Sequence, residues 1–394
     1  MGVTVSPAYP ITAYAACCAL GMTSEELLGA LYQGRTGLSA SDFSPGIGTA
    51  LGALPVRLPR LPSRLREYET RVARMSALLC EPLQQPLTAA IRRYGAARVG
   101  IVVASSTAGL AASERAHAEH SVHARLPEWY RFERSHAFHA LCDVLRALSG
   151  ARGPGYVVST ACSSANKVFG SAQRLLAAGA VDAVLVGGID TLCQVTVRGF
   201  HGLGILSATP CRPFARERDG TSIGEGGALL LIERTGDARV ALRGVGECCD
   251  AHHMTQPAPD GSGASAAMRA ALADAGLPAS AIDHVNAHGT GTPLNDAAEA
   301  RAIESVFGDA VPVVSTKAAT GHMLGAAAAI EAVFCIAAIE RGALPPSLGS
   351  TPRDPEVRLN IPSEARALRC RNVISNALAF GGSNASVIFG ELAC

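Results

Sequence analysis

Four residues from three separate segments of the chain have side chains suited to covalent catalysis: Cys162, His288, Lys317 and His322. A thiol can attack a carbonyl carbon, an imidazole can move a proton, and a lysine ammonium can adjust the charge around both. The first three each follow an apolar run and lie among small residues, a pattern that indicates the end of a strand. We therefore predict that separate strand ends bring a thiol, two imidazoles and a lysine to one pocket.

Cys162 lies in "VVSTACSSANKVFG" (157–170), where a β-branched run changes to apolar residues at helical spacing. The pattern predicts a buried strand that turns into a helix at Cys162. We expect the positive end of the helix dipole to lower the pKa of the thiol, because it stabilises the thiolate. Considered alone, Cys162 is also explained as a small buried residue at a helix start.

Two loops are predicted to line a pocket with donors and acceptors. In "NAHGTGTPLND" (286–296), neighbouring glycines leave His288 free to face a pocket, and the hydroxyls of Thr290 and Thr292 suit an elongated polar ligand. In "NALAFGGSNA" (376–385), paired glycines would bring backbone N–H groups to a developing oxyanion. A core histidine and a β-turn are the ordinary alternatives.

The segment "VVSTKAATGHMLGAAAAIEA" (313–332) places Lys317 and then His322 ahead of an Ala-rich helix. Glu331, within that helix, is predicted to be the charge partner of Lys317. A surface lysine is the alternative for Lys317 considered alone.

The 394-residue chain is 48% hydrophobic and 17% charged, which predicts a large buried core, in two packed halves. Its 34 basic and 33 acidic residues give a formal net charge of +1, so no overall field attracts nucleic acid or a membrane surface. Residues 1–23 do not resemble a secretory signal, and Glu331 interrupts the apolar segment 324–340. We therefore expect a cytoplasmic protein.

The cysteine and histidine pattern predicts no metal site. The 12 cysteines lack framework spacing, which favours reduced core residues over disulfides. In "ECCDAHHM" (247–254), Cys248 and Cys249 would point to opposite faces of a strand, and no second C-x-x-C pair accompanies them. The histidines within 107–155 share no spacing with thiol or acidic ligands, so that region is predicted to be a helical cap or an oligomer contact.

Strand-like and helix-like segments alternate, which predicts an α/β fold with layered sheets covered on both faces. The predicted strands are 97–106, 181–190, 225–234, 239–250, 282–290, 311–316, 372–382 and 385–392, and the predicted helices are 163–179, 263–276, 294–308 and 326–342. Residues 1–236, with Cys162, and residues 237–394, with His288, His322 and Lys317, are expected to repeat one topology.

Five linked motifs occur in one order: "TACSSA" around Cys162, "CRPFARERDGTSIGEGG" (211–227), "HGTGTPLND" with His288, "TKAATGHMLGAA" with Lys317 and His322, and "ALAFGGSNA" with Phe380. In these motifs and their spacing the chain resembles the elongating β-ketoacyl-acyl-carrier-protein synthases of the thiolase-like superfamily, from about Ala13 to the C-terminus. The resemblance implies a five-layered α-β-α-β-α core of two similar halves, usually dimeric, with a Cys–His–His catalytic set.

The resemblance also implies a role for each matching residue. Cys162 accepts the acyl chain, and His288 and His322 assist decarboxylation of a malonyl thioester and hold the enolate. Loss of His322 is accordingly expected to spare acylation and abolish condensation. The further implied assignments are Lys317 with Glu331 orienting His322, the N–H groups of Cys162 and Phe380 as an oxyanion hole, the Phe380 ring as a gate, Thr290 and Thr292 binding the phosphopantetheine arm, Gly381 in the substrate loop, Thr107 near the base of the acyl pocket, and Asp296 and Glu299 as structural supports.

The implied reaction is decarboxylative Claisen condensation of an acyl thioester with malonyl-acyl carrier protein, in fatty acid or polyene/polyketide chain elongation. No cofactor is expected on the enzyme, because phosphopantetheine of the acyl carrier protein carries the substrates. Thr221 stands where many fatty-acid-elongating members have an aromatic residue, and the motifs are closer in style to the aryl-polyene branch.

The alternative function is a non-catalytic, chain-length-factor-like partner of a ketosynthase heterodimer, although such subunits generally lack the active cysteine. A thiolase or a Cys–His–Asn initiation synthase would differ at His322, and a cysteine hydrolase would not need Lys317. Homodimer and heterodimer with a chain-length partner both stay open.

Overall fold

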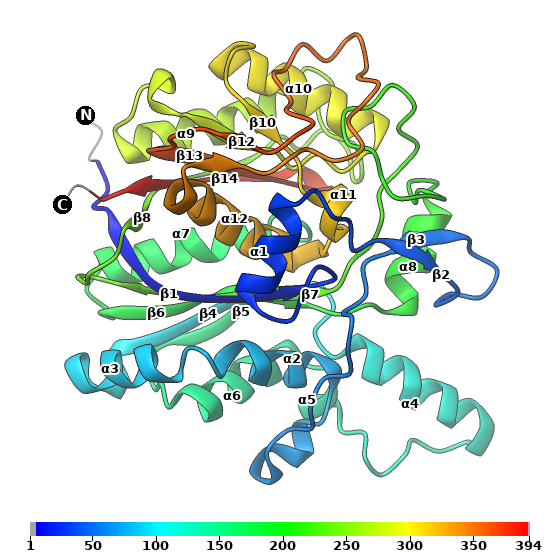
Figure 1. Ribbon diagram of the computed structural model, residues 1–394. Helices are drawn as coiled ribbons and strands as arrows, with labels where there is room; N and C mark the ends of the chain where they lie inside the picture. The colour runs from blue at the N-terminus through cyan, green and yellow to red at the C-terminus, as the bar shows by residue number, and fades with distance from the viewer. Residues whose placement is uncertain (1–4, 393–394) are drawn as a thin grey trace.

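The computed structural model describes residues 5–392, which build alternating layers of helices and sheet (Figure 1). The strands are β1 (Tyr9–Cys18), β2 (Ser39–Ser41), β3 (Thr49–Leu51), β4 (Val99–Ala104), β5 (Gly155–Val158), β6 (Ala183–Asp190), β7 (Gly226–Glu233), β8 (Val240–Cys249), β9 (His284–Asn286), β10 (Val313–Val314), β11 (Ala343–Leu344), β12 (Arg366–Ala367), β13 (Asn372–Ala379) and β14 (Ser383–Glu391). The α-helices are α1 (Ser24–Tyr32), α2 (Arg71–Cys80), α3 (Gln84–Tyr94), α4 (Leu110–His123), α5 (Phe132–Ser135), α6 (Phe138–Ser149), α7 (Ser164–Ala177), α8 (Gln194–Gly202), α9 (Ser262–Ala275), α10 (Pro293–Phe307), α11 (Lys317–Thr320) and α12 (Ala327–Arg341).

Ten strands form a hydrogen-bonded sheet in the order β10-β9-β13-β14-β8-β1-β7-β6-β4-β5. β1 and β8 are joined near their starts by the pairs Tyr9–Leu242 and Pro10–Ala241, so each side of this junction is a five-stranded half. Taken outward from the junction, β1-β7-β6-β4-β5 and β8-β14-β13-β9-β10 have the same strand order relative to the chain and the same parallel and antiparallel pairings. The chain therefore uses one topology twice, and the expected boundary at 236/237 lies between β7 and β8.

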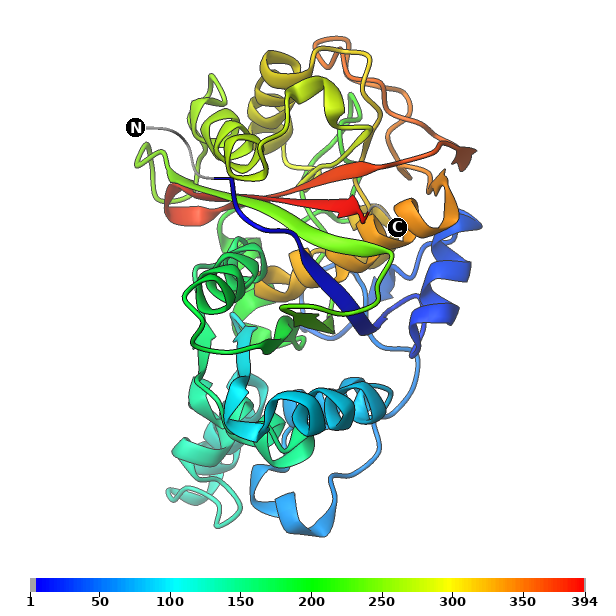
Figure 2. The same ribbon diagram turned by 90° about the vertical axis from the view of Figure 1, so that its left-hand side faces the viewer.

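The two half-sheets enclose a central layer formed by α7 and α12 (Figures 1 and 2). Helices α2, α3 and α6 cover the outer face of the first half-sheet, and α9 and α10 lie over the second. The predicted five-layered α-β-α-β-α core is confirmed. Every residue of α12 from Ala327 to Ile339 is buried, which explains why this helix is apolar on all sides apart from Glu331. Within residues 5–392, no helix combines the length and apolar character that a membrane crossing requires.

The strands that lead to the reactive residues differ from the sequence prediction, β5 in its exposure and β9 and β10 in their length. β5 is the last strand of the ten-stranded sheet, and its Tyr156 is 40% exposed, so this strand is not buried as expected. β9 and β10 stop at Asn286 and Val314, well before the predicted ends at 290 and 316. His288 therefore lies in a loop beyond β9, and Lys317 is the first residue of the short helix α11 beyond β10.

The segment 107–155 is helical, as predicted, but only part of it covers the core. α6 packs on β4 and β5, whereas α4 contacts α5 and extends away from the sheet in Figure 1. Large apolar side chains stay exposed along this region: Val122, Leu126, Trp129, Phe132 and Phe138.

Candidate active site

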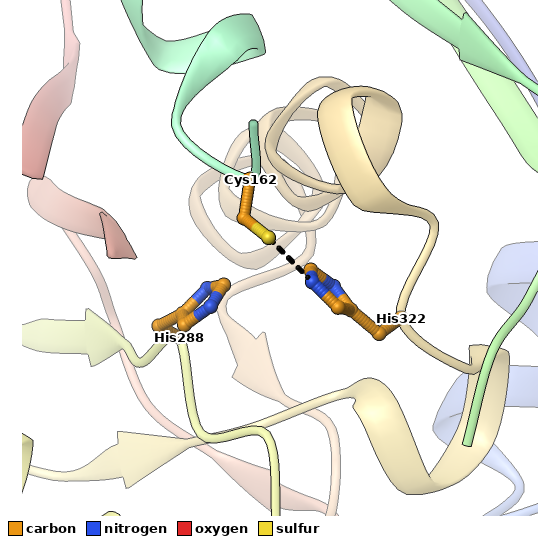
Figure 3. A group of neighbouring side chains, drawn as sticks. All are labelled: Cys162, His288 and His322. Carbon is orange, nitrogen blue, oxygen red and sulfur yellow. Dashed lines mark hydrogen bonds between the residues drawn. The ribbon is translucent and has the colours of Figure 1, made fainter. Parts of the chain in front are cut away.

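Cys162, His288 and His322 come from three separate segments and meet at one point (Figure 3). Their ligand-type atoms all lie within 4.8 Å of one another, and Nε2 of His322 is 2.9 Å from Sγ of Cys162. The two imidazole rings are 5.2 Å apart between centroids and nearly perpendicular, at 85°. The predicted convergence of the thiol with both imidazoles is therefore present in the structure.

A strained turn presents the thiol of Cys162. Ala161 has a φ of 51°, a left-handed conformation that costs a residue with a Cβ roughly 1–3 kcal/mol. Side-chain contacts hold the turn, since Thr160 N donates to Ser164 Oγ at 2.8 Å and Ser164 Oγ donates to the Ala161 carbonyl at 2.5 Å. α7 starts at Ser164, so Cys162 lies at the predicted junction of strand and helix.

Burial is the largest influence on the pKa of the Cys162 thiol. The residue is 6% exposed, and desolvation raises the pKa of its thiol to about 12, while Lys317 acts in the opposite direction. Desolvation also lowers the pKa values of His288 and His322, and the positive charge of Lys317 lowers them further. The expected lowering of the thiol pKa by the helix end is therefore outweighed by desolvation, which raises this pKa and favours a neutral thiol beside neutral imidazoles.

Lys317 is fully buried and forms an ion pair with Glu331, with 2.6 Å between Nζ and Oε1. Its ammonium also donates to the backbone carbonyl of His288. The predicted Lys317–Glu331 pair is thus present, and Lys317 is not on the surface. The contact that Lys317 makes with an active-site histidine goes to His288 and not to His322, so the expected orientation of His322 by Lys317 is not what the structure shows.

Two buried carboxylates hold the loop that carries His288. Glu299 accepts hydrogen bonds from the N–H groups of His288 and Gly289, both at 2.7 Å. Asp296 accepts from the N–H groups of Phe214, at 2.8 Å, and Gly291, at 3.2 Å. Burial raises the pKa of Glu299 to about 7 and also raises the pKa of Asp296. Both residues contact backbone and not the cavity, in agreement with a supporting position.

The three reactive side chains open into a pocket of about 340 Å³. Thr290 and Thr292 line it and hydrogen-bond to each other at 2.9 Å between hydroxyl oxygens. The Phe380 ring stacks on Phe200, with 5.8 Å between centroids and 27° between planes. Besides these residues, the wall is formed by Leu203, Ile205, Thr221, Asp250, Thr255, Gln256, Pro257, Pro293, Leu294, Asn295, Leu378, Ala379 and Asn384.

Thr107 and Gly381 do not occupy the positions expected for substrate contacts. The backbone N–H and the hydroxyl of Thr107 both donate to Asp190 Oδ1 at 2.7 Å, and Thr107 is absent from the pocket wall. The N–H of Gly381 donates to the Met254 carbonyl at 2.7 Å, and this glycine does not line the pocket either. Thr107 thus belongs to a buried network around Asp190, and Gly381 anchors the loop through its backbone.

Sequence reasoning missed a large part of the pocket wall. Phe200 comes from α8, for which no helix was predicted, and Thr255 to Pro257 come from the loop after β8. The signal for this loop was Asp250 with its neighbouring histidines, which the sequence analysis weighed only as zinc ligands. Thr221, singled out in the sequence, does line the pocket, and its hydroxyl has no hydrogen-bond partner although the residue is 1% exposed.

The contacts of the two imidazole rings show how well the site suits a metal ion. Within residues 5–392, Cys162, His288 and His322 are the group whose spacing could hold one. Metal-bound histidines usually donate their second ring nitrogen to a carboxylate or carbonyl, but Nδ1 of both His288 and His322 lacks a partner. The donor set thus lacks the outer contacts of a typical metal centre, and no contact selects one tautomer of either imidazole.

Two protein-family models match the chain. They are Beta-ketoacyl synthase, N-terminal domain, over residues 87–238, and Beta-ketoacyl synthase, C-terminal domain, over residues 240–351. The chain is 40% identical over 257 residues to 3-oxoacyl-(acyl-carrier-protein) synthase 2 of Staphylococcus aureus, a match that covers 61% of this chain. The chain spans 64% of the length of that curated relative.

Similarity to solved structures extends over almost the whole chain. A chain of the ketosynthase in complex with its chain length factor from Xenorhabdus doucetiae is 34% identical, with a TM-score of 0.90 and 98% of both chains covered. A beta-ketoacyl synthase from Burkholderia phymatum is 30% identical, with a TM-score of 0.90, and the alignment covers 98% of this chain and all of that one. With both domain models matched in order and the fold shared from end to end, this chain belongs to the beta-ketoacyl synthase family.

Proposed function

We propose that the chain is a 3-oxoacyl-acyl-carrier-protein synthase that catalyses decarboxylative Claisen condensation. The observation that carries this proposal is the meeting of the Cys162 thiol with the His288 and His322 imidazoles at one pocket. The half 1–236 supplies the nucleophile, and the half 237–394 supplies both histidines.

In the first half-reaction, Sγ of Cys162 bonds to the carbonyl carbon of an acyl thioester. Nε2 of His322, 2.9 Å from the sulfur, takes the thiol proton, and when the bond between the carbonyl carbon and the carrier sulfur breaks it gives this proton to the departing thiolate. The backbone N–H groups of Cys162 and Phe380 hold the negative oxygen of the tetrahedral intermediate. This role for His322 differs from the expectation that its loss spares acylation.

In the second half-reaction, a malonyl thioester loses CO₂, and the electrons of the broken carbon–carbon bond form an enolate. Nε2–H groups of His288 and His322 hold the enolate oxygen, which requires the tautomer of His322 opposite to the one that accepts the thiol proton. The absence of an Nδ1 partner on either ring leaves that exchange open. The enolate carbon then attacks the acyl carbonyl, the carbon–sulfur bond to Cys162 breaks, and the thiolate takes a proton from water.

The substrates are proposed to arrive on an acyl carrier protein, with the phosphopantetheine arm along Thr290 and Thr292. We also propose that the reaction uses no resident cofactor or metal and that the protein is cytoplasmic. The hydroxyl of Thr221, which has no hydrogen-bond partner, is a polar group in the pocket wall. It supports an acyl chain that is not a plain saturated one, as in polyene or polyketide elongation.

A second ketosynthase-like chain is the proposed partner. β5 ends the sheet and leaves one edge open, and the 107–155 region, which leads into β5 along the chain, carries exposed apolar residues. An edge strand with apolar surroundings is a site for strand addition by another chain. Mass measurement of the Trp129→Asp variant alone and with a candidate chain-length partner tests this interface, and an unchanged assembly would rule it out.

Intact mass spectrometry tests the enzymatic proposal directly. After incubation with an acyl carrier donor, we expect the wild type to gain one acyl mass at Cys162 and a Cys162→Ala variant to gain none. Cys249→Ser is the matched control, because Cys249 is the exposed cysteine of the described chain and lies outside the pocket wall. A wild type that never gains the acyl mass would favour the non-catalytic, chain-length-factor-like alternative.

A further inference from the structure

Asn166 is a fully buried polar residue in the first turn of α7, four residues after Cys162. Its side-chain Nδ2 donates two hydrogen bonds, to the backbone carbonyls of Ser375 and Ala385, both at 3.0 Å. Ala165 and Val168, the buried positions on either side of it, are apolar, and the buried polar residues elsewhere on this helix are Ser164, Ser171 and Gln173. An apolar side chain would avoid the cost of burying an amide, so packing alone does not account for an asparagine here.

The two carbonyls belong to the strands on either side of the Phe380 loop. β13, with Ser375, runs into Phe380, and β14, with Ala385, starts directly after the loop. A second contact crosses at the same place, because the hydroxyl of Ser163 donates to the hydroxyl of Ser383 at 3.2 Å. The start of α7 is thus bonded to both strands that carry the loop.

These contacts join the two halves of the fold at the point where the reaction is proposed to occur. Cys162 belongs to the first half, whereas Phe380 belongs to the second, and more than two hundred residues separate them. Neither Asn166 nor Ser163 lines the pocket, so neither touches the substrate in the described structure. Their contacts instead set the distance between the Cys162 corner and the Phe380 loop.

We propose that Asn166 is a positioning residue that sets the spacing of the Cys162 and Phe380 N–H groups. The inference rests on the proposed function, in which these two groups stabilise the oxyanion of acyl transfer. Asn166 should not affect decarboxylation, since the enolate oxygen is held by His288 and His322. A displacement of catalytic groups by about 1 Å can cost about 100-fold in rate, so loss of the Asn166 contacts should be visible in acyl transfer.

The test compares two steps in matched variants. Asn166→Leu keeps the number and branching of the side-chain heavy atoms and removes both donors. Gln173→Leu is the control, because Gln173 lies on the same helix and also crosses to the second half, where its Nε2 donates to Asp274 at 2.8 Å. Ser383→Ala removes the other contact without altering α7. For each protein we would measure the acylation rate of Cys162, CO₂ release from malonyl-acyl carrier protein, and the melting temperature.

We expect Asn166→Leu to acylate at least ten-fold more slowly than the wild type, with CO₂ release within two-fold, and Gln173→Leu to match the wild type in both steps. Ser383→Ala should slow acylation in the same direction, and it decides the question if Asn166→Leu does not fold. Equal loss of acylation and decarboxylation in Asn166→Leu would overturn the inference. Acylation rates of Asn166→Leu and Ser383→Ala that both stay within two-fold of the wild type would also overturn it. Failure of the proposed function gives a different result, namely a wild type that is never acylated at Cys162.

Discussion

The neutral thiol of Cys162 leads to a quantitative prediction for its reactivity with iodoacetamide as pH is varied. Burial raises the pKa of this thiol from 9.0 to about 12. At about pH 8, this change lowers the thiolate fraction roughly 1000-fold relative to an unperturbed thiol. A more basic thiolate is intrinsically more nucleophilic, which recovers roughly 20-fold. We therefore expect alkylation of Cys162 about 50-fold slower than that of a free cysteine derivative.

The assay is intact-mass or peptide-level detection of carbamidomethyl-Cys162 between about pH 6 and pH 9.5, with Cys162→Ala as the blank. The rate should rise about ten-fold per pH unit and show no plateau, because the whole range lies below the raised pKa of the thiol. A plateau with a midpoint between pH 6 and pH 8, at a rate equal to that of the free cysteine derivative or higher, would show a thiolate–imidazolium pair. That result would refute the argument that desolvation outweighs both Lys317 and the helix dipole at this site.

Four other predictions follow from the buried groups around the pocket. Lys317→Met should lower the free energy of unfolding by about 3–5 kcal/mol in urea titrations, because it leaves Glu331 buried without its ion-pair partner. The Lys317→Met/Glu331→Leu double variant should recover most of this loss. A Lys317→Met variant within about 1 kcal/mol of the wild type would contradict the prediction. Because the pKa of Glu299 is raised from 4.5 to about 7, folding favours its protonated form, so its contribution to stability is complete below about pH 4.5 and is lost as pH rises to about 7. Glu299→Gln should remove this decline, worth about 3 kcal/mol, and a denaturation midpoint with the wild-type pH dependence would argue against it. Thr221→Val should raise stability by about 1 kcal/mol, since it removes a buried hydroxyl without a partner, and a destabilised variant would be inconsistent with that hydroxyl being unsatisfied. His322→Ala should slow acylation of Cys162 by about 100- to 10,000-fold at constant pH, whereas an unchanged rate would restore the division of roles that the sequence resemblance implied.

The main elements around the site could be predicted from the sequence because local patterns specify them. The helices at 163–179, 263–276, 294–308 and 326–342 are present with ends shifted by at most a few residues. Strand ends were less accurate, since β9 and β10 stop early and β5 is an exposed edge. A strand ends where its pairing partners end, and those partners are distant in the chain, so a local pattern does not contain that information.

The substrate contacts show the same limit. The family resemblance implies that Thr107 lies near the base of the acyl pocket, but its hydroxyl donates to Asp190. Phe200 lines the pocket without any motif that marks it, and the histidines that follow Asp250 mark the loop after β8 without showing that it faces the pocket. Which side chains face a cavity depends on the packing of α8 and the loops against each other, and that packing has no signature in a single segment.

The sequence by itself determined the layered α/β architecture, the repeat of one topology and the set of reactive residue types, because periodicity and motif spacing act over short stretches of chain. Only the tertiary structure decided which atoms meet: Sγ of Cys162 with Nε2 of His322, and Lys317 with the His288 carbonyl. It also decided the ionisation of the thiol. Desolvation depends on how many groups from distant segments surround an atom, and that number exists only once the chain has folded.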